Sequence, residues 1–161
     1  MNAAPAARSP RSAWTRAGLV LAGVLALDQI VKALVVSSLE RGEERAIVAG
    51  IKLVNTRNSG VAFGQLQDGG VLVAVVIAIA IGALLVYFSR HVSTPLMWLP
   101  TGMLLGGALG NIIDRLREGA VIDFLKLPYW PAFNVADASI TVGVVILLVV
   151  IERGDRARAA A

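Results

Sequence analysis

The feature that most restricts the fold is an uninterrupted apolar stretch from Val71 to Phe88 that carries no charged side chain. A helix needs about 20 mostly apolar residues to cross the hydrocarbon core of a bilayer, and this stretch has about 18. Residues 17–36, 96–115 and 134–151 form three further stretches of similar length. Hydrophobic residues make up 57% of the chain and charged residues only 16%, which is far from an ordinary soluble domain. The sequence therefore predicts an all-α integral membrane fold with four transmembrane helices.

The segments around these stretches define the remaining organisation. Residues 1–16 are rich in Ala, Pro and Ser and contain three arginines, so we expect a disordered basic tail. Residues 152–161 form a second basic tail, and residues 17–151 form the membrane domain. A cleavable signal peptide is the alternative interpretation of the first apolar stretch, but the apolar pattern resumes after Asp28.

Two longer connections separate the predicted spans, over residues 37–70 and 116–133. Residues 46–55 contain β-branched and apolar residues around Ala49 and Gly50, which is typical of a short hairpin or small sheet. We expect this small β-rich element to be extracytoplasmic and to lie against the membrane surface. In the second connection, residues 119–125 are expected to be extended and residues 128–131 to form an aromatic turn at headgroup level.

Four spans put both termini on the same side of the membrane. The arginine-bearing tails and the short turn with Arg90 indicate that this side is the cytoplasm. His91 in the same turn is expected to be a solvated loop residue.

Cysteine and histidine usage excludes several kinds of chemistry. The chain has no cysteine, so disulfides, thiolate nucleophiles and thiolate metal ligands are absent. One histidine cannot supply a zinc cluster, and we expect neither a metal nor a cofactor. The net charge of +4 lies at the ends and loops, which favours phospholipid headgroups over nucleic acid as a partner.

Polar residues gather in one stretch, residues 106–138, between two apolar segments. A buried ionisable group costs several kcal/mol unless it is paired or used, so this stretch is a candidate site. It carries three aspartates, two asparagines and an arginine: Asp114, Asp123, Asp137, Asn111, Asn134 and Arg115. Gly102, Gly106 and Gly110 precede them at four-residue intervals, a pattern that lets membrane helices approach closely.

The first span contributes two charges of its own. Asp28 and Lys32 stand four residues apart, with the acid on the N-terminal side, which is the favourable orientation for an ion pair on a helix. Such a pair either fixes the helix against its neighbours or contacts a substrate directly. With the predicted topology, all these intramembrane polar residues fall in the outer leaflet.

Asp123 lies in the connection that joins the last two spans, so it can reach Asp137. Two carboxylates a few ångströms apart in a low-dielectric setting share one proton and titrate as a unit. An aspartic protease needs this arrangement, because one carboxylate activates a water while the other polarises the scissile carbonyl. Intramembrane ion or proton transport through the same carboxylates is the alternative function.

Five motifs in this order resemble those of the lipoprotein signal peptidases, the type II signal peptidases of bacterial plasma membranes. They are D-Q-x-x-K at residues 28–32, N-x-G-x-A-F at 58–63, G-G-x-x-G-N-x-x-D-R at 106–115, V-[IV]-D-F ending at Phe124, and F-N-x-A-D at 133–137. The resemblance covers nearly the whole chain from the first span to the last.

The resemblance implies an intramembrane aspartic endopeptidase of the bacterial inner membrane. Such an enzyme cleaves the signal peptide of a diacylglyceryl-modified prolipoprotein just before the lipid-bearing Cys, needs no metal and is inhibited by globomycin-type compounds. We expect it to be a monomer. Asp123 and Asp137 would be catalytic, and the supporting residues would be Asp28, Lys32, Asn58, Gly60, Asn111, Asp114, Arg115, Asn134 and Ala136.

Three residues depart from the family pattern. Ser59 and Val61 stand where Thr and Ala are usual, and Ala138 replaces a frequent Ser. The last change removes a hydroxyl beside Asp137, so a side-chain hydrogen bond from that position is not expected.

Overall fold

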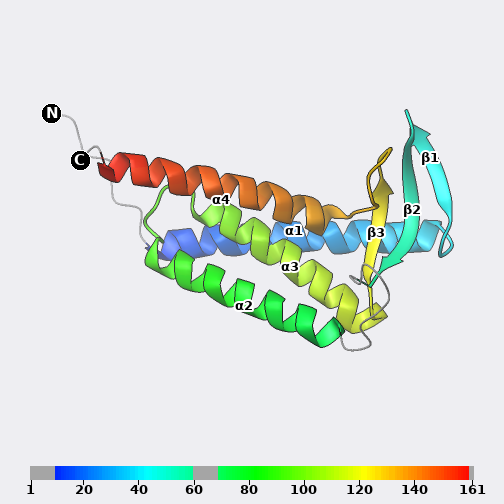
Figure 1. Cartoon of the computed structure of the whole chain (residues 1–161), viewed down its shortest axis with the longest axis horizontal. Helices are drawn as coiled ribbons and strands as arrows, with labels where there is room; N and C mark the ends of the chain where they lie inside the picture. The colour runs from blue at the N-terminus through cyan, green and yellow to red at the C-terminus, as the bar shows by residue number, and fades with distance from the viewer. Residues whose placement is uncertain (1–9, 60–68, 160–161) are drawn as a thin grey trace.

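A computed structural model describes residues 10–59 and 69–159 of the chain. In this part of the chain, helices run side by side and a small sheet covers one end of the bundle (Figure 1). The helices are α1 (Pro10–Ser38), α2 (Gly69–Arg90), α3 (Trp98–Glu118) and α4 (Val135–Ala159), and the strands are β1 (Glu44–Val48), β2 (Ile51–Asn58) and β3 (Val121–Lys126). Helices α2 and α3 start and end close to the predicted spans, whereas α1 and α4 are longer than predicted.

The first and last helices extend into both predicted tails. Residues 10–16 were expected to be disordered, but they form the start of α1. Proline suits the first helical position, where Pro10 stands, and Trp14 packs edge-on against Phe88 with ring centroids 4.6 Å apart. The predicted tail at 152–161 is helical through Ala159, because alanine and arginine are strong helix formers. Residues 1–9 and 160–161 lie outside the described residues.

Glycines on α3 allow its close packing against α1, as the sequence predicted. A Cβ at Gly102 would lie 2.5 Å from the Ala17 carbonyl oxygen, and one at Gly106 would lie 2.8 Å from that of Leu21. Gly107 faces α4 instead, where a Cβ would lie 2.6 Å from a backbone oxygen. Helix α3 therefore touches α1 and α4 through backbone-to-backbone contacts that any side chain would prevent.

The helices expose apolar side chains and bury charged ones. Leu19, Ile79 and Leu148 are each more than 60% exposed, whereas Asp28 is 0% and Lys32 only 2% exposed. This distribution suits a hydrocarbon solvent. By length and composition α1 and residues 135–156 of α4 can cross a membrane, with mean hydropathies of 2.1 and 2.3. The described apolar part of α2, Val75–Arg90, is shorter.

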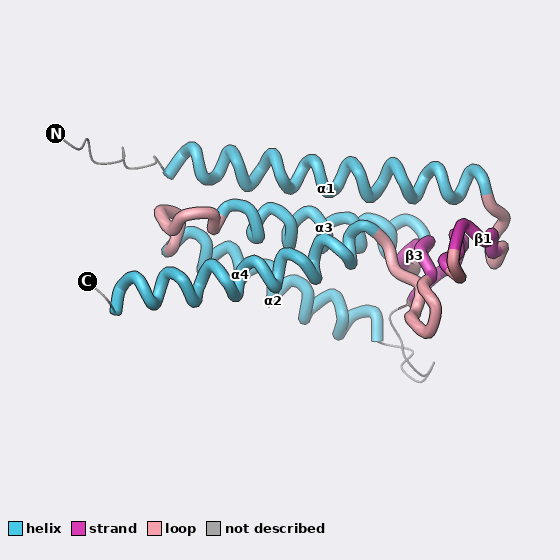
Figure 2. The backbone as a smooth tube through the Cα atoms, turned by 90° about the horizontal axis from the view of Figure 1, so that it is seen from above, coloured by secondary structure: helices cyan, strands magenta, loops and turns pink. Residues whose placement is uncertain are grey.

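The predicted β-rich element is a three-stranded antiparallel sheet in the order β1-β2-β3. The hairpin between β1 and β2 turns at Ala49 and Gly50, whose φ values of 48° and 80° fit the two-residue turn that favours strand twist. Phe124 on β3 packs with Val35 near the end of α1 and with Leu39 just after it, which fixes the sheet on the bundle. The view from above shows the strands at the end opposite the start of α1 and the end of α4 (Figure 2).

Candidate active site

Asp123 lies in the middle of β3 and is 1% exposed. Both of its carboxylate oxygens accept hydrogen bonds from amide side chains. Asn58 Nδ2 donates to Oδ2 at 2.9 Å, and Asn134 Nδ2 donates to Oδ1 at 2.8 Å. The side chain is therefore held in one orientation by two donors from different elements.

An irregularity in the sheet contributes to this arrangement. Leu53 pairs with Leu125 and Thr56 pairs with Asp123, so two residues of β2 stand opposite one residue of β3. One of the two is Asn55, which is buried and donates from Nδ2 to the carbonyl oxygen of Leu39 at 2.8 Å. A bulge of this kind bends a strand and redirects the side chains that follow. Beyond it, Asn58 meets Asp123.

Asp137 lies in the first turn of α4 and forms a reciprocal cap with Asn134, the residue before the helix. Asn134 Oδ1 accepts from the Asp137 backbone N–H at 2.8 Å, and Asp137 Oδ2 accepts from the Asn134 N–H at 3.3 Å. This is the geometry of a capping box, with Asn and Asp in place of the more common Ser and Glu. The carboxylate is thereby fixed at the positive end of the helix dipole.

Asn134 joins the two carboxylates. Its Nδ2 group donates to Asp123, and its Oδ1 and backbone N–H hold Asp137. Asn111 on α3 completes the link, because its Nδ2 donates to Asp137 Oδ1 at 2.8 Å while its Oδ1 accepts from Asn134 at 3.1 Å. The structure thus brings together Asp123 and Asp137, which lie 14 positions apart in the sequence, through two buried amides.

A buried charge cluster lies behind this pair. Lys32 Nζ is 2.7 Å from Asp28 Oδ2 and 2.7 Å from Asp114 Oδ2, and it donates to Asn111 Oδ1 at 3.3 Å. The ammonium thereby fixes which side of the Asn111 amide donates to Asp137. Both carboxylates also accept backbone N–H groups, Asp28 from Ala136 at 2.9 Å and Asp114 from Ile122 at 3.0 Å. The cluster therefore ties α1 and α3 to α4 and β3.

Burial raises the pKa of Asp123 to about 6, well above the ordinary 3.8. The hydrogen bond from Asn58 opposes this rise, the negative charge of Asp137 adds to it, and Asn134 and Lys32 lower the pKa again. A carboxyl group with such a pKa is available in both protonation states near neutral pH.

Seven of the nine supporting residues predicted from the sequence contact the carboxylate pair or the charge cluster, and Arg115 does not. Arg115 donates to the backbone oxygen of Asn111 in its own helix at 3.2 Å, a contact that stays within α3. Gly60 lies outside the described residues, as do the other residues of its motif beyond Ser59. The side chain of Ala138 is exposed, while Asp137 is held by the two asparagines.

Sequence reasoning assigned no role to Asn55 and named Gln29 only as part of the motif at residues 28–32. Gln29 Nε2 donates to Asp114 Oδ1 at 3.1 Å and contacts Asp28 Oδ2 at 3.3 Å. Gln29 could have been identified from the sequence, because it is a polar amide beside Asp28 within an otherwise apolar stretch. The role of Asn55 depends on the bulge, which leaves no mark in the hydropathy pattern.

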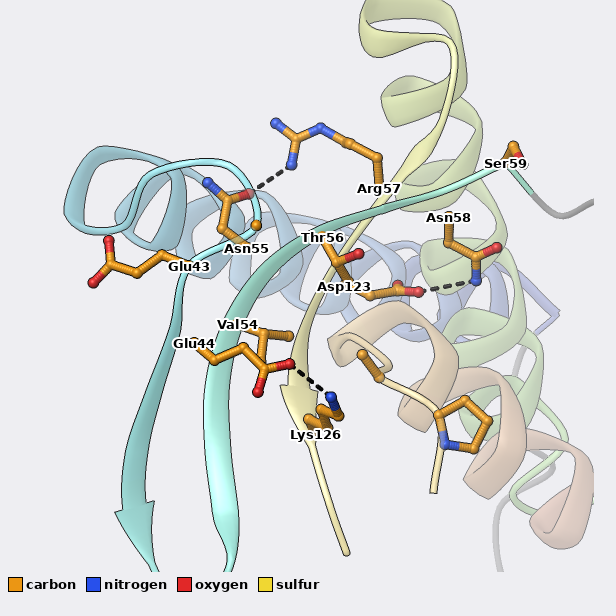
Figure 3. A pocket seen from close by; sticks show the side chains of 13 residues that line it. Glu43, Glu44, Val54, Asn55, Thr56, Arg57, Asn58, Ser59, Asp123 and Lys126 are labelled. Atoms are coloured by element: carbon orange, nitrogen blue, oxygen red, sulfur yellow. Dashed lines mark hydrogen bonds and ion pairs between the residues drawn. The ribbon is translucent and has the colours of Figure 1, made fainter. Parts of the chain in front are cut away.

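Two hollows are relevant to a substrate, and one of them reaches Asp123. A cavity of about 460 Å³ opens on the sheet and includes Asn58 and Asp123 in its lining (Figure 3). The second, of about 610 Å³, lies among α2, α3 and α4 and is lined by apolar side chains and Tyr87. It includes Ile140, one helical turn from Asp137. Within residues 10–59 and 69–159, no three His, Asp or Glu side chains are grouped to hold a metal ion.

The chain is similar over most of its length to proteins of one family. A family model described as signal peptidase (SPase) II matches residues 20–152. The lipoprotein signal peptidase of Halothermothrix orenii is 38% identical over 131 residues, covering 81% of this chain and 90% of that protein. That of Symbiobacterium thermophilum is 42% identical over 149 residues, covering 84% and 95%.

Two solved structures described as bacterial membrane enzymes have the same fold. Each is 28% identical to this chain, with TM-scores of 0.73 and 0.75. The first alignment covers 84% of this chain and 91% of the other, and the second covers 85% and 87%.

Proposed function

Since this chain belongs to the signal peptidase II family, whose members remove signal peptides from prolipoproteins, we propose that it cleaves its substrate with an aspartic dyad, Asp123 and Asp137. The observation that carries the proposal is the buried Asn134, which contacts both carboxylates within 3.3 Å. It holds groups from a strand and a helix in one constellation. Two carboxylates held in this way can share a proton, which is the arrangement that an aspartic protease uses to hydrolyse an amide.

The proposed reaction gives each carboxylate its own role. Asp123, whose pKa is raised to about 6 by burial, is the protonated member and donates to the scissile carbonyl oxygen. Asp137, the other member, takes a proton from the attacking water, whose oxygen bonds to the carbonyl carbon. The tetrahedral intermediate then collapses, the C–N bond breaks, and a proton passes from the dyad to the leaving amine.

The proposed substrate is a diacylglyceryl-modified prolipoprotein, cut just before the lipid-bearing Cys. The apolar hollow among α2, α3 and α4 suits the hydrophobic part of the signal peptide or the acyl chains. Acyl chains add about 0.8 kcal/mol of membrane affinity per CH₂ and therefore fix the depth of the scissile bond. A scissile bond held at the depth of the dyad reaches it by lateral diffusion in the membrane alone.

The same proposal sets the arrangement in the membrane. We propose that all four helices span the bilayer, that both termini are cytoplasmic, and that the sheet and the dyad lie at the outer leaflet of the bacterial inner membrane. The arginine-bearing helix ends support this orientation. Inhibition by globomycin-type compounds and a monomeric state are further predictions of the resemblance.

A direct test compares two precursors with the same peptide sequence, one lipidated at the Cys and one not, incubated with the purified protein in mixed lipid and detergent micelles. We expect the lipidated precursor to be cut before the Cys, as read by product mass. The kcat/KM for the unlipidated precursor should be lower by at least about two orders of magnitude. Equal cleavage of both would show that lipid-determined depth does not select the substrate. Cleavage of neither would contradict the proposed activity itself.

A further inference from the structure

The cavity of about 460 Å³ on the sheet has features that the cleavage reaction does not use. It extends from Asp123 and Asn58 to a pair formed by Glu44 and Lys126 (Figure 3). Val54 and Thr56 line it from β2, and Pro131 and Ala132 line it from the turn before α4. The cavity is thus a polar, open hollow that begins at one member of the proposed dyad.

The far end of this cavity is lined by Glu44 and Lys126, and Lys52 binds the same carboxylate from outside the lining. Glu44 lies between two ammonium groups, with Lys126 Nζ 2.6 Å from Oε1 and Lys52 Nζ 2.7 Å from Oε2. These two hydrogen bonds lower the pKa of Glu44 to about 2, so it is ionised at neutral pH. Two ammonium groups against one carboxylate leave a net charge of +1. We call Lys52, Glu44 and Lys126 the lysine trio.

Apart from Asp123, the other charged residues that line the cavity are already paired. Glu43 accepts from Arg45 at 3.2 Å, and Arg57 lies 3.3 Å from Glu118. Each of these pairs is neutral overall. The lysine trio therefore determines the sign of the charge that a bound segment meets beyond Asp123.

The distance along the strand indicates which part of a substrate reaches the trio. Asp123 and Lys126 are three residues apart on β3, which corresponds to about 10 Å of extended chain. The apolar hollow among α2, α3 and α4 suits the hydrophobic signal segment, whereas the sheet cavity is polar. An extended substrate that crosses the dyad would therefore run its mature segment over the sheet.

We propose, on the basis of the proposed function, that the sheet cavity binds the segment after the lipid-bearing Cys and that the lysine trio favours an acidic side chain at about the third residue of that segment. The trio side chains are 37–44% exposed, so the preference is modest and sensitive to salt. This preference would discriminate among precursors that all carry the lipid.

The test uses three lipidated precursors that differ only at the third residue after the Cys, which is Asp, Asn or Lys. With the wild-type protein in about 0.05 M salt, we expect kcat/KM for the Asp precursor to exceed that for the Asn precursor about two- to five-fold, with the Lys precursor lower still. In about 0.5 M salt the three values should converge. Each precursor is also tested with the charge moved to the second or fourth residue.

The matched variants distinguish the effect of the lysine trio from the effect of the net charge of the protein. Lys52→Gln combined with Lys126→Gln changes the trio from +1 to −1 and should reverse the order of the Asp and Lys precursors. Arg153→Gln combined with Arg156→Gln removes the same charge at the far end of α4 and should leave the order unchanged.

Equal kcat/KM values for the charged precursors at all three positions would overturn the inference, as would an order that persists in the lysine double variant. Neither result would affect the proposed function, because cleavage of lipidated precursors would still occur. Loss of cleavage of every precursor by the wild-type protein would instead contradict the proposed function.

Discussion

Asn134 uses every polar atom of its side chain and its backbone N–H within the candidate site. One primary amide thereby positions two acids that would otherwise repel each other at close range. An alanine at this position would remove the helix cap and the link to Asp123 together. At the scale of single residues, the site therefore depends on amide orientation as much as on the carboxylates.

The raised pKa of Asp123 predicts how stability depends on pH. Below pH 3.8 the group is protonated in both states, and between 3.8 and about 6 it ionises in the unfolded chain first. The folded protein then binds more protons than the unfolded one, so stability falls as pH rises through this window. We expect the melting temperature in detergent to decrease from pH 4 to pH 6.5. The decrease should be smaller in Asp123→Asn, and an identical slope in both proteins would contradict the raised pKa.

We predict that Lys32 contributes to stability. Measuring this contribution decides between the two interpretations of its pair with Asp28. Lys32→Met leaves Asp28 and Asp114 buried without a counter-ion and should cost about 3–5 kcal/mol of unfolding free energy. Arg156→Met breaks an exposed pair and should cost no more than about 1 kcal/mol. Unfolding in detergent measures both. A Lys32→Met protein that melts like the wild type but loses activity would instead assign the pair to substrate binding.

At the scale of elements, the glycines of α3 determine how closely the helices approach and where the charge cluster lies. A Cβ on Gly110 would lie 2.6 Å from Asp28 Oδ2, so this glycine makes room for the carboxylate as well as for the backbone. The spacing of Gly102, Gly106 and Gly110 could be recognised in the sequence because it repeats at a helical interval. The glycines pack against α1 because α1 presents backbone carbonyls, two valine side chains and the Asp28 carboxylate to them.

Gly110→Ala should therefore destabilise the protein, by about 1–3 kcal/mol, because the added methyl must displace Asp28 from Lys32. Gly23→Ala on α1 is the matched control, since a Cβ there meets nothing within 4 Å. Alanine should stabilise that helix position by about 0.5–1 kcal/mol. Thermal melts of the two variants in the same detergent measure the difference. Equal melting temperatures would contradict the close contact at Gly110.

The sheet shows where sequence reasoning stops at this scale. The hairpin was predictable from β-branched residues around Ala49 and Gly50, and the extended segment with Asp123 was predictable as well. The pairing of that segment with β2 was not, because it joins residues about 65 positions apart. The bulge at Asn55 is a property of that pairing, so no local pattern indicates it.

On the scale of the whole molecule, the described charged residues that are buried all lie at the sheet end of the bundle. Asp28, Lys32, Asp114 and Asp123 meet there, whereas the other end is closed by an apolar cluster around Phe88 and Met97. Hydropathy alone predicted the helical bundle and the convergence of the polar residues. It did not predict the full lengths of α1 and α4, because amphipathic ends rich in alanine and arginine resemble solvated tails.

The proposed topology predicts that the sheet end of the bundle is accessible from outside the inner membrane and that the opposite end is not. Because the chain has no cysteine, single cysteines report position without background labelling. In intact cells, a membrane-impermeant maleimide that crosses only the outer membrane should label Arg45→Cys on β1. It should label Ser93→Cys, in the turn between α2 and α3, only after the inner membrane is permeabilised. Labelling of Ser93→Cys in intact cells would contradict cytoplasmic termini.

The measurement that tests the dyad most directly is the kcat/KM for a lipidated precursor with Asp123→Asn, Asp137→Asn and the double variant. If the two carboxylates act as one unit, each single variant should lose at least about three orders of magnitude, and the double variant should lose no more than either single variant. Asp155→Asn, at the far end of α4, should keep wild-type activity, and wild-type-like melting would confirm that the variants are folded. Near-normal turnover in either single variant, or losses that multiply in the double variant, would contradict a shared-proton dyad.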